Sequence, residues 1–188
     1  MTVTHLTSCP EAGAEVRLRK IAELVPLAAT RAGAAEHSAA TAAVPETTLD
    51  DLEWADAILL GTPVHFGLAA PRLMHFINTT SASSIAGRLA NKAVSAFASG
   101  SAAHGGQVSA ILALHNAICH WGSIIVATGS TDPVVYLPHN GNPYGASSVV
   151  GGTPGRVRDE NLEAVEFQAR RTTQVAVALV RGGIEAVA

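Results

Sequence analysis

The sequence predicts an α/β domain built on a parallel sheet. Short apolar runs at residues 57–60, 93–97 and 124–126 show no polar alternation, which is typical of strands buried on both faces. Helical patterns separate these runs, and strands that alternate with helices form parallel sheets with right-handed crossovers. The first run ends abruptly at residues 61–63, Gly-Thr-Pro. Because open α/β folds bind ligands at the carboxyl ends of their strands, we expect a site there.

Composition restricts the function further. The 188 residues are 48% hydrophobic and 14% charged, which favours one folded domain over a disordered chain. No apolar run reaches membrane-spanning length and no signal peptide is visible, so we expect a cytoplasmic location and no membrane partner. A net charge of −3 argues against nucleic-acid binding. Two cysteines, Cys9 and Cys119, lack zinc-like spacing, and we expect no metal.

The first 47 residues give the weakest pattern. Residues 2–7 form a short β-branched stretch, and Glu15–Arg19 alternates polar and apolar side chains as an edge or half-buried strand does. Residues 22–46 are rich in alanine without a sustained period, and we expect a surface excursion there. We therefore treat residues 1–188 as a single domain whose part before residue 48 is irregular.

Helix signals become clear from residue 48 onward. Thr48 and Asp51 have the spacing of a capping box, which predicts a short helix before the strand at 57. Pro71 fits the first turn of the next helix. Three- and four-residue spacing predicts a helix over 108–118, and a last helix is expected from about 159 to 181. The order is that of a layered sheet with strands at about 57–61, 93–98 and 123–127.

Four segments carry a family resemblance: residues 61–67, 99–107, 120–122 and 143–147. They resemble segments of flavodoxin-like NAD(P)H:quinone oxidoreductases of the tryptophan repressor-binding protein type. Residues 61–67, Gly-Thr-Pro-Val-His-Phe-Gly, are similar to the flavin-ring loop of that family. Residues 99–107 resemble its Ser/Thr/Gly loop, and His120-Trp121-Gly122 resembles a histidine-containing turn before the last strand. Residues 143–147, Pro-Tyr-Gly-Ala-Ser, resemble its most family-specific loop. Together these segments extend the resemblance over roughly residues 13 to 183.

The resemblance implies a flavodoxin-like three-layer sandwich with a five-stranded parallel sheet, FMN as cofactor, and a homodimer or homotetramer. It implies hydride transfer from NAD(P)H through FMN to a quinone. The positions that would bind the cofactor are Val64, His65, Phe66, Ser99, Gly100, Ser101, Gly105 and His120. His120 would meet the polar edge of the flavin ring and serve as the catalytic donor. Two departures concern the substrate side: His65 replaces a common arginine, and a frequent tryptophan is missing near Ser84.

A larger departure lies at the front of the chain. The family begins with a strand and a Ser-x-x-Gly loop that wraps the FMN phosphate at a helix N-terminus. Residues 1–13 contain no such loop and leave no room for the following helix. We therefore expect an N-terminally truncated flavodoxin-like domain. A missing strand would expose an apolar sheet edge, favouring oligomers, and a missing phosphate loop would weaken FMN binding.

Several alternatives stay open at this point. His120 could be a satisfied histidine near a helix end, and Cys119 a small buried hydrophobe. The chain could be a flavodoxin-type electron carrier, or a truncated paralogue with weak or no FMN binding that acts as an oligomer partner. The sequence determines neither the preference for NADH or NADPH nor the quinone.

Overall fold

A computed structural model describes residues 14–24, 39–150 and 157–184. In chain order, the elements are α3 (Leu49–Trp54), β1 (Ala57–His65), β2 (Leu68–Ala69), α4 (Pro71–Thr79), α5 (Ser81–Ile85), β3 (Ala93–Gly100), α6 (Gln107–His120), β4 (Ile124–Ile125), the 3-10 helix η2 (Pro133–Tyr136), β5 (Ser147–Val149) and α7 (Asp159–Arg181).

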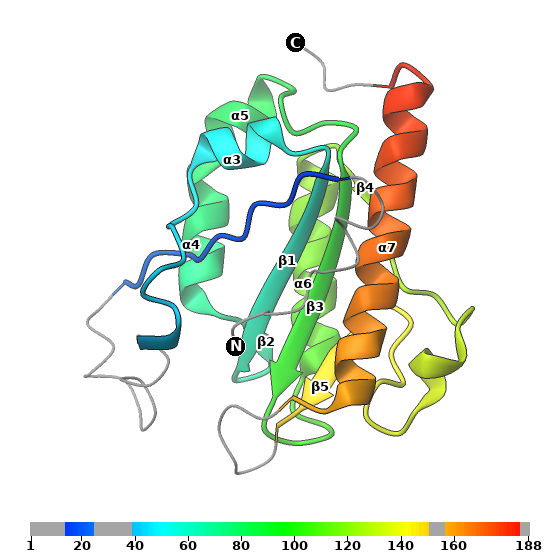
Figure 1. The fold of residues 1–188 in the computed structure, drawn as a ribbon. Helices are drawn as coiled ribbons and strands as arrows, with labels where there is room; N and C mark the ends of the chain where they lie inside the picture. The colour runs from blue at the N-terminus through cyan, green and yellow to red at the C-terminus, as the bar shows by residue number, and fades with distance from the viewer. Residues whose placement is uncertain (1–13, 25–38, 151–156, 185–188) are drawn as a thin grey trace.

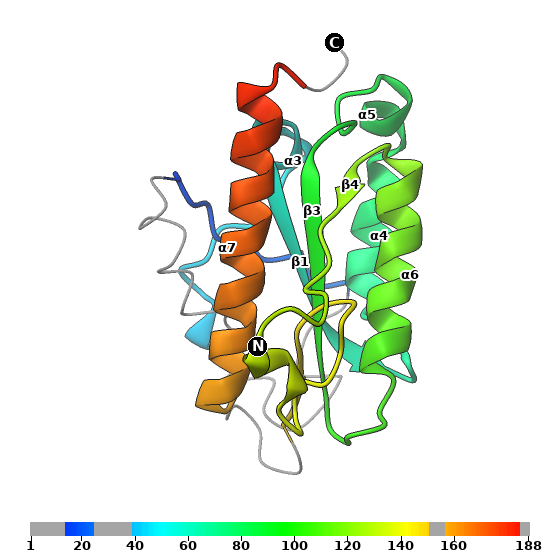
Figure 2. The ribbon, with the colours of Figure 1, turned by 90° about the vertical axis from the view of Figure 1, so that its right-hand side faces the viewer.

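The elements form three layers (Figures 1 and 2). The sheet has the order β2-β1-β3-β4, and β5 pairs with β3 beyond the end of β4. In Figure 2, α7 covers one face of the sheet, and α4 and α6 cover the other. β1 and β3 run parallel from the pair Ala57–Ala93 to the pair Pro63–Ser99. The predicted layered α/β fold with a parallel sheet is therefore confirmed.

β3 is the centre of the core, and all eight of its residues are buried. On the α4 and α6 side, small and aliphatic β3 residues such as Val94 pack with Ile111 and Leu114. On the α7 side, Phe97 packs with Val165 and its neighbours. A strand covered on both faces needs no polar alternation, which is why its sequence is a continuous apolar and small-residue run.

β1 is longer than predicted, because it continues through residues 61–63 to His65. The ring of Phe97 lies directly against Gly61, and a Cβ at that position would collide with it. Glycine at position 61 therefore lets the strand pass the Phe97 ring. Pro63 is tolerated because a residue at the edge of a sheet can lack an N–H donor. The chain then reverses at Phe66 and Gly67, and β2 pairs antiparallel with the end of β1. The prediction that the strand stops at Gly61 is wrong.

The predicted strand at Glu15–Arg19 is absent, since residues 14–19 make no strand pairing. This segment runs across the strands rather than along them (Figure 1), and only Lys20 forms a single bridge, to Glu46. The guanidinium of Arg17 lies 3.7 Å from the centre of the Trp54 ring. The alternating pattern therefore reflects contacts with α3 instead of a sheet. The β-branched stretch at 2–7 lies outside the described residues.

The predicted strand at 123–127 is shorter than expected, with only two residues in β4. The chain leaves the sheet after Val126 and returns as β5, which pairs with β3 at Ala98–Gly100. β5 was not predicted. Its three residues, Ser-Ser-Val, are too short to give a periodic signal.

Two helix starts confirm their sequence signals. The hydroxyl of Thr48 accepts a hydrogen bond from the Asp51 N–H at 3.2 Å, and the Asp51 carboxylate accepts one from the Thr48 N–H at 3.0 Å. Pro71 occupies the first turn of α4. The capping box and the first-turn proline determine where α3 and α4 begin. They therefore set the points at which the chain enters and leaves the β1–β2 hairpin.

Candidate functional site

Two loops meet at the carboxyl edge of the sheet, where the arrowheads of β1 and β3 lie in Figure 1. One is the hairpin tip at Phe66 and Gly67, and the other is the loop 101–106 after β3. Gly106 has φ +97° and lies so near Gly67 that a Cβ on Gly106 would come within 2.5 Å of the Gly67 Cα. Glycine at 106 is therefore required both by backbone conformation and by the contact between the loops.

Phe66 is the most unusual residue of this edge. Its φ of 51° lies in the left-handed region, which few non-glycine residues adopt, and its side chain is fully exposed. An exposed aromatic ring on a strained turn contributes nothing to the core. It offers a flat apolar surface on which another ring can stack. Val64 and His65, which precede it in β1, are half-buried.

The loop after β3 is held by Gln107, the first residue of α6. Its Nε2 donates a hydrogen bond to the Ala102 carbonyl at 2.7 Å, and its side chain also packs against Gly100. Ser99 and Gly100 are buried at the strand end, whereas residues 101–104 are exposed. The loop is thus anchored at its base and open at its tip.

The structure brings seven of the predicted ligand-binding residues to this one edge: Val64, His65, Phe66, Ser99, Gly100, Ser101 and Gly105. Sequence reasoning missed two participants. Gln107 holds the loop, and the only sequence signal for it is its place directly after Gly105-Gly106. Ser148 of β5 lies beside Ser99, and its Oγ is buried without a hydrogen-bond partner.

His120 lies at the opposite edge. α6 begins at the carboxyl edge and returns alongside the sheet, so its last residue is near the start of β3, where the Asn91 N–H donates to the Gly122 carbonyl at 3.0 Å. The 14 residues of α6 span about 20 Å at 1.5 Å per residue. There the His120 carbonyl accepts a hydrogen bond from Ser84 Oγ. The structure therefore does not bring His120 to the loops of its own chain.

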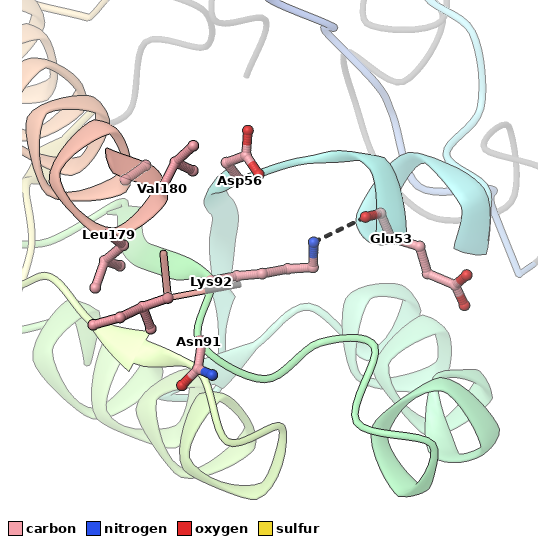
Figure 3. A pocket seen from close by; sticks show the side chains of 8 residues that line it. Glu53, Asp56, Asn91, Lys92, Leu179 and Val180 are labelled. Atoms are coloured by element: carbon pink, nitrogen blue, oxygen red, sulfur yellow. Dashed lines mark hydrogen bonds between the residues drawn. The ribbon is translucent and has the colours of Figure 1, made fainter. Parts of the chain in front are cut away.

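A cavity of about 250 Å³ lies at that amino edge of the sheet (Figure 3). Its lining consists of Glu53, Asp56, Asn91, Lys92, Ala176, Leu179, Val180 and Ile184. Lys92 is buried, and its ammonium donates hydrogen bonds to the Glu53 carbonyl at 2.9 Å and the Ala55 carbonyl at 2.7 Å. Burial lowers the pKa of Lys92.

This cavity is unsuited to a flavin. Binding sites for drug-sized ligands usually enclose about 300–1,000 Å³, and aromatic residues commonly line them. Neither condition holds here, since the lining contains no aromatic side chain. Lys92 instead places a positive charge at the carbonyl end of α3, where a cation is stabilising. The hydrogen bonds of Lys92 at this edge therefore stabilise the fold.

The carboxyl edge fits the ring of FMN. Phe66 supplies an aromatic surface, and Gly105 and Gly106 let a ligand approach the backbone closely. The loop 101–104 is exposed. The prediction that residues 1–13 lack the family's phosphate loop concerns a segment outside the described residues.

Other kinds of site find no support within the described parts of the chain. No three His, Cys, Asp or Glu residues among them lie close enough to hold a metal ion. No helix that the structure describes is both long and apolar enough to span a bilayer.

Comparisons with known proteins identify the family. Residues 3–131 match the family of NADPH-dependent FMN reductases. A protein of Geobacter sulfurreducens named NAD(P)H dehydrogenase (quinone) is 38% identical over 176 residues, which cover 89% of this chain and 85% of the relative. A protein of the same name from Deinococcus radiodurans is 36% identical over 171 residues, covering 90% of this chain and 84% of the relative.

A solved structure supports the fold independently. The flavodoxin-like, WrbA-like protein of Agrobacterium tumefaciens superposes with a TM-score of 0.53 at 18% identity, covering 69% of this chain and 71% of the other. The chain therefore belongs to the NADPH-dependent FMN reductase family, and it is an oxidoreductase of flavodoxin-like fold that works with FMN and NAD(P)H.

Proposed function

We propose that this protein transfers two electrons, as hydride, from NAD(P)H through FMN to a quinone. The observation that carries the proposal is the convergence of residues 64–66 and 99–105 at the carboxyl edge of the sheet. The relatives named NAD(P)H dehydrogenase (quinone) support the choice of acceptor, since they align with about nine-tenths of this chain.

The protein's own residues bind and orient the ring. Val64, His65 and Phe66 would hold one side of the ring, with Phe66 as the stacking surface, and the loop from Ser99 to Gly105 would hold the other side. When bound, FMN supplies the hydride chemistry. Residues 101–104 are exposed, and hydrogen bonds from the N–H groups of this loop would stabilise negative charge on the ring.

His120 has a different place in this proposal. Because the length of α6 separates it from the ring loops of its own chain, we assign its role to the flavin of a partner copy in a homodimer or homotetramer. The outer face of α6 favours such an assembly, since the helix contains no Asp, Glu, Lys or Arg, and Val108 and Leu112 are each 39% exposed. Uncharged, partly apolar helix faces suit association between copies.

The proposal is tested on the purified chain. FMN is titrated in while flavin fluorescence is followed, and the loaded protein is then mixed with NADH or NADPH and a benzoquinone. We expect oxidation of one NAD(P)H per quinone reduced. FMN binding combined with electron transfer to a one-electron acceptor, but with no quinone reduction, would instead identify an electron carrier.

A further inference from the structure

Gln168 of α7 fills a gap in the sheet. β4 and β5 pair with the same edge of β3, but β4 pairs at Ala93 and Val94 and β5 only from Ala98 onward. Between them lies Ala96, whose carbonyl accepts a hydrogen bond from Gln168 Nε2 at 2.9 Å. The Oε1 of the same side chain accepts one from the Ala146 N–H at 2.8 Å. The side-chain amide thus donates one hydrogen bond and accepts another, as the N–H and C=O of a backbone peptide in a neighbouring strand would do.

The segment that Gln168 holds lies directly on β3. Gly145 is so close to the Ala96 carbonyl oxygen that a Cβ would overlap with it. The Ala146 carbonyl accepts a hydrogen bond from the Ala98 N–H at 3.1 Å. Both backbone groups of Ala146 are therefore hydrogen-bonded: its N–H to Gln168 and its carbonyl to β3.

These hydrogen bonds help to fix the register of β5 on β3. β5 starts one residue later, and beyond its end the Val150 N–H donates to the Gly100 carbonyl at 2.9 Å. Gln107 Nε2 lies 3.4 Å from the Ser148 carbonyl and 2.7 Å from the Ala102 carbonyl. β5 and the loop 101–106 consequently share one hydrogen-bonded side chain, and a shift of β5 is transmitted to that loop.

We propose that Gln168 is a positioning residue for the flavin-ring loop. It acts through Ala146 and β5 and touches no ligand itself. Gln168 is 0% exposed, and burying an amide is unfavourable unless its hydrogen bonds are made, so an apolar side chain would serve packing alone equally well. This inference rests on the proposed function, because it assigns the loop 101–106 to flavin binding.

The test compares Gln168→Met with Thr172→Val. Thr172 is also 0% exposed and lies one turn further along α7. Its hydroxyl donates to the backbone carbonyl of Gln168 at 2.7 Å and pairs with Ser95, but it reaches neither the Gln168 side chain, Ala146 nor β5. The two readouts are the dissociation constant for FMN, measured without NAD(P)H, and amide hydrogen exchange at Ala146, Val150 and residues 101–106. For Gln168→Met we expect about tenfold weaker FMN binding, the loss typical of one hydrogen bond, and faster exchange at those amides. Thr172→Val should stay within about twofold of the parent protein in both readouts.

Equal effects of the two substitutions would overturn the proposal, since they would show a general packing defect. Unchanged exchange at residues 101–106 in a folded Gln168→Met protein would also overturn it. Gln168→Asn takes its place if the methionine variant does not fold, because it keeps a neutral amide while its shorter side chain cannot reach both Ala96 and Ala146. Parent protein that binds no FMN would refute the proposed function, while the exchange comparison would still decide the positioning role.

Discussion

The two edges of the sheet use polar and aromatic residues in opposite ways. At the amino edge, Lys92 and Trp121 are buried and paired: Lys92 donates to two carbonyls, and Trp121 Nε1 donates to Thr80 Oγ1 at 2.8 Å. At the carboxyl edge Phe66 is fully exposed at a positive φ, and residues 101–104 are open to solvent. The first edge stabilises the fold, and the second retains surface that only a ligand or partner would cover.

The parallel topology explains this difference. Each helix that follows a strand begins at the carboxyl edge, so the positive ends of α4, α6 and α7 point toward the same side of the sheet. Their free N–H groups make this edge suited to ligands with negative charge. The amino edge collects helix carbonyls instead, which explains why a buried lysine is stable there.

Lys92→Met should give the largest effect on stability and none on the site. It leaves the Glu53 and Ala55 carbonyls without their donor, so the free energy of unfolding should fall by about 2–4 kcal/mol. FMN affinity of the folded protein should be unchanged within about twofold. Urea unfolding and FMN titration measure the two quantities. A large loss of FMN affinity would show that the two edges are coupled, and would contradict the division into a stabilising edge and a ligand-binding edge.

Gly106→Ala should disturb the carboxyl edge next most strongly. The substitution combines a strained positive φ with a collision against Gly67, and we expect a loss of about 2–3 kcal/mol and at least tenfold weaker FMN binding. Gly67→Ala is the matched control, because Gly67 has φ +81° but a Cβ added to it would meet no atom within 4 Å. It should lose only about 1 kcal/mol. Equal losses in the two variants would mean that the contact between the loops is unimportant.

Phe66→Ala should separate function from stability. Because the side chain is fully exposed, the free energy of unfolding should change by less than about 0.5 kcal/mol, whereas kcat/KM for quinone reduction should fall about tenfold. Leu68→Ala provides the control, since Leu68 is 59% exposed on the adjacent β2 but is not assigned to the ring. Stopped-flow and steady-state assays measure the rates. Similar losses in both variants would indicate a general effect of the hairpin.

The smallest expected effect is a pH dependence that involves neither edge. Burial lowers the pKa of His115 on α6, and its Nε2 has no hydrogen-bond partner. The unfolded chain therefore binds more protons than the folded one just below pH 6.5, and stability should decrease as the pH falls through that range. His115→Leu should remove this part of the slope in chemical unfolding measured from pH 7.5 to 5. An unchanged slope would place its origin in other groups.

Much of the fold could be read from the sequence because its signals are local. The apolar runs at 57–60 and 93–97 identify buried strands, and Thr48 with Asp51 identifies a helix start, since each depends only on neighbouring residues. The residues predicted for the ring lie in two such segments that end at the same sheet edge. The position of His120 follows from topology, since a helix after a parallel strand ends at the amino edge of the sheet. The family resemblance instead placed His120 at the flavin ring.

The rest depended on contacts between distant segments. Gly61 and Pro63 indicate a strand end locally, yet the Phe97 ring and the pairing with β3 keep them in β1. Gln168 has no sequence signal for its bonds to Ala96 and Ala146, which are 72 and 22 residues away. The sequence by itself therefore determined the two central strands, the main helices and the sheet edge proposed for the site. Only the tertiary structure decided which side chains complete the sheet, because a buried polar group is stable only where its partners happen to meet it.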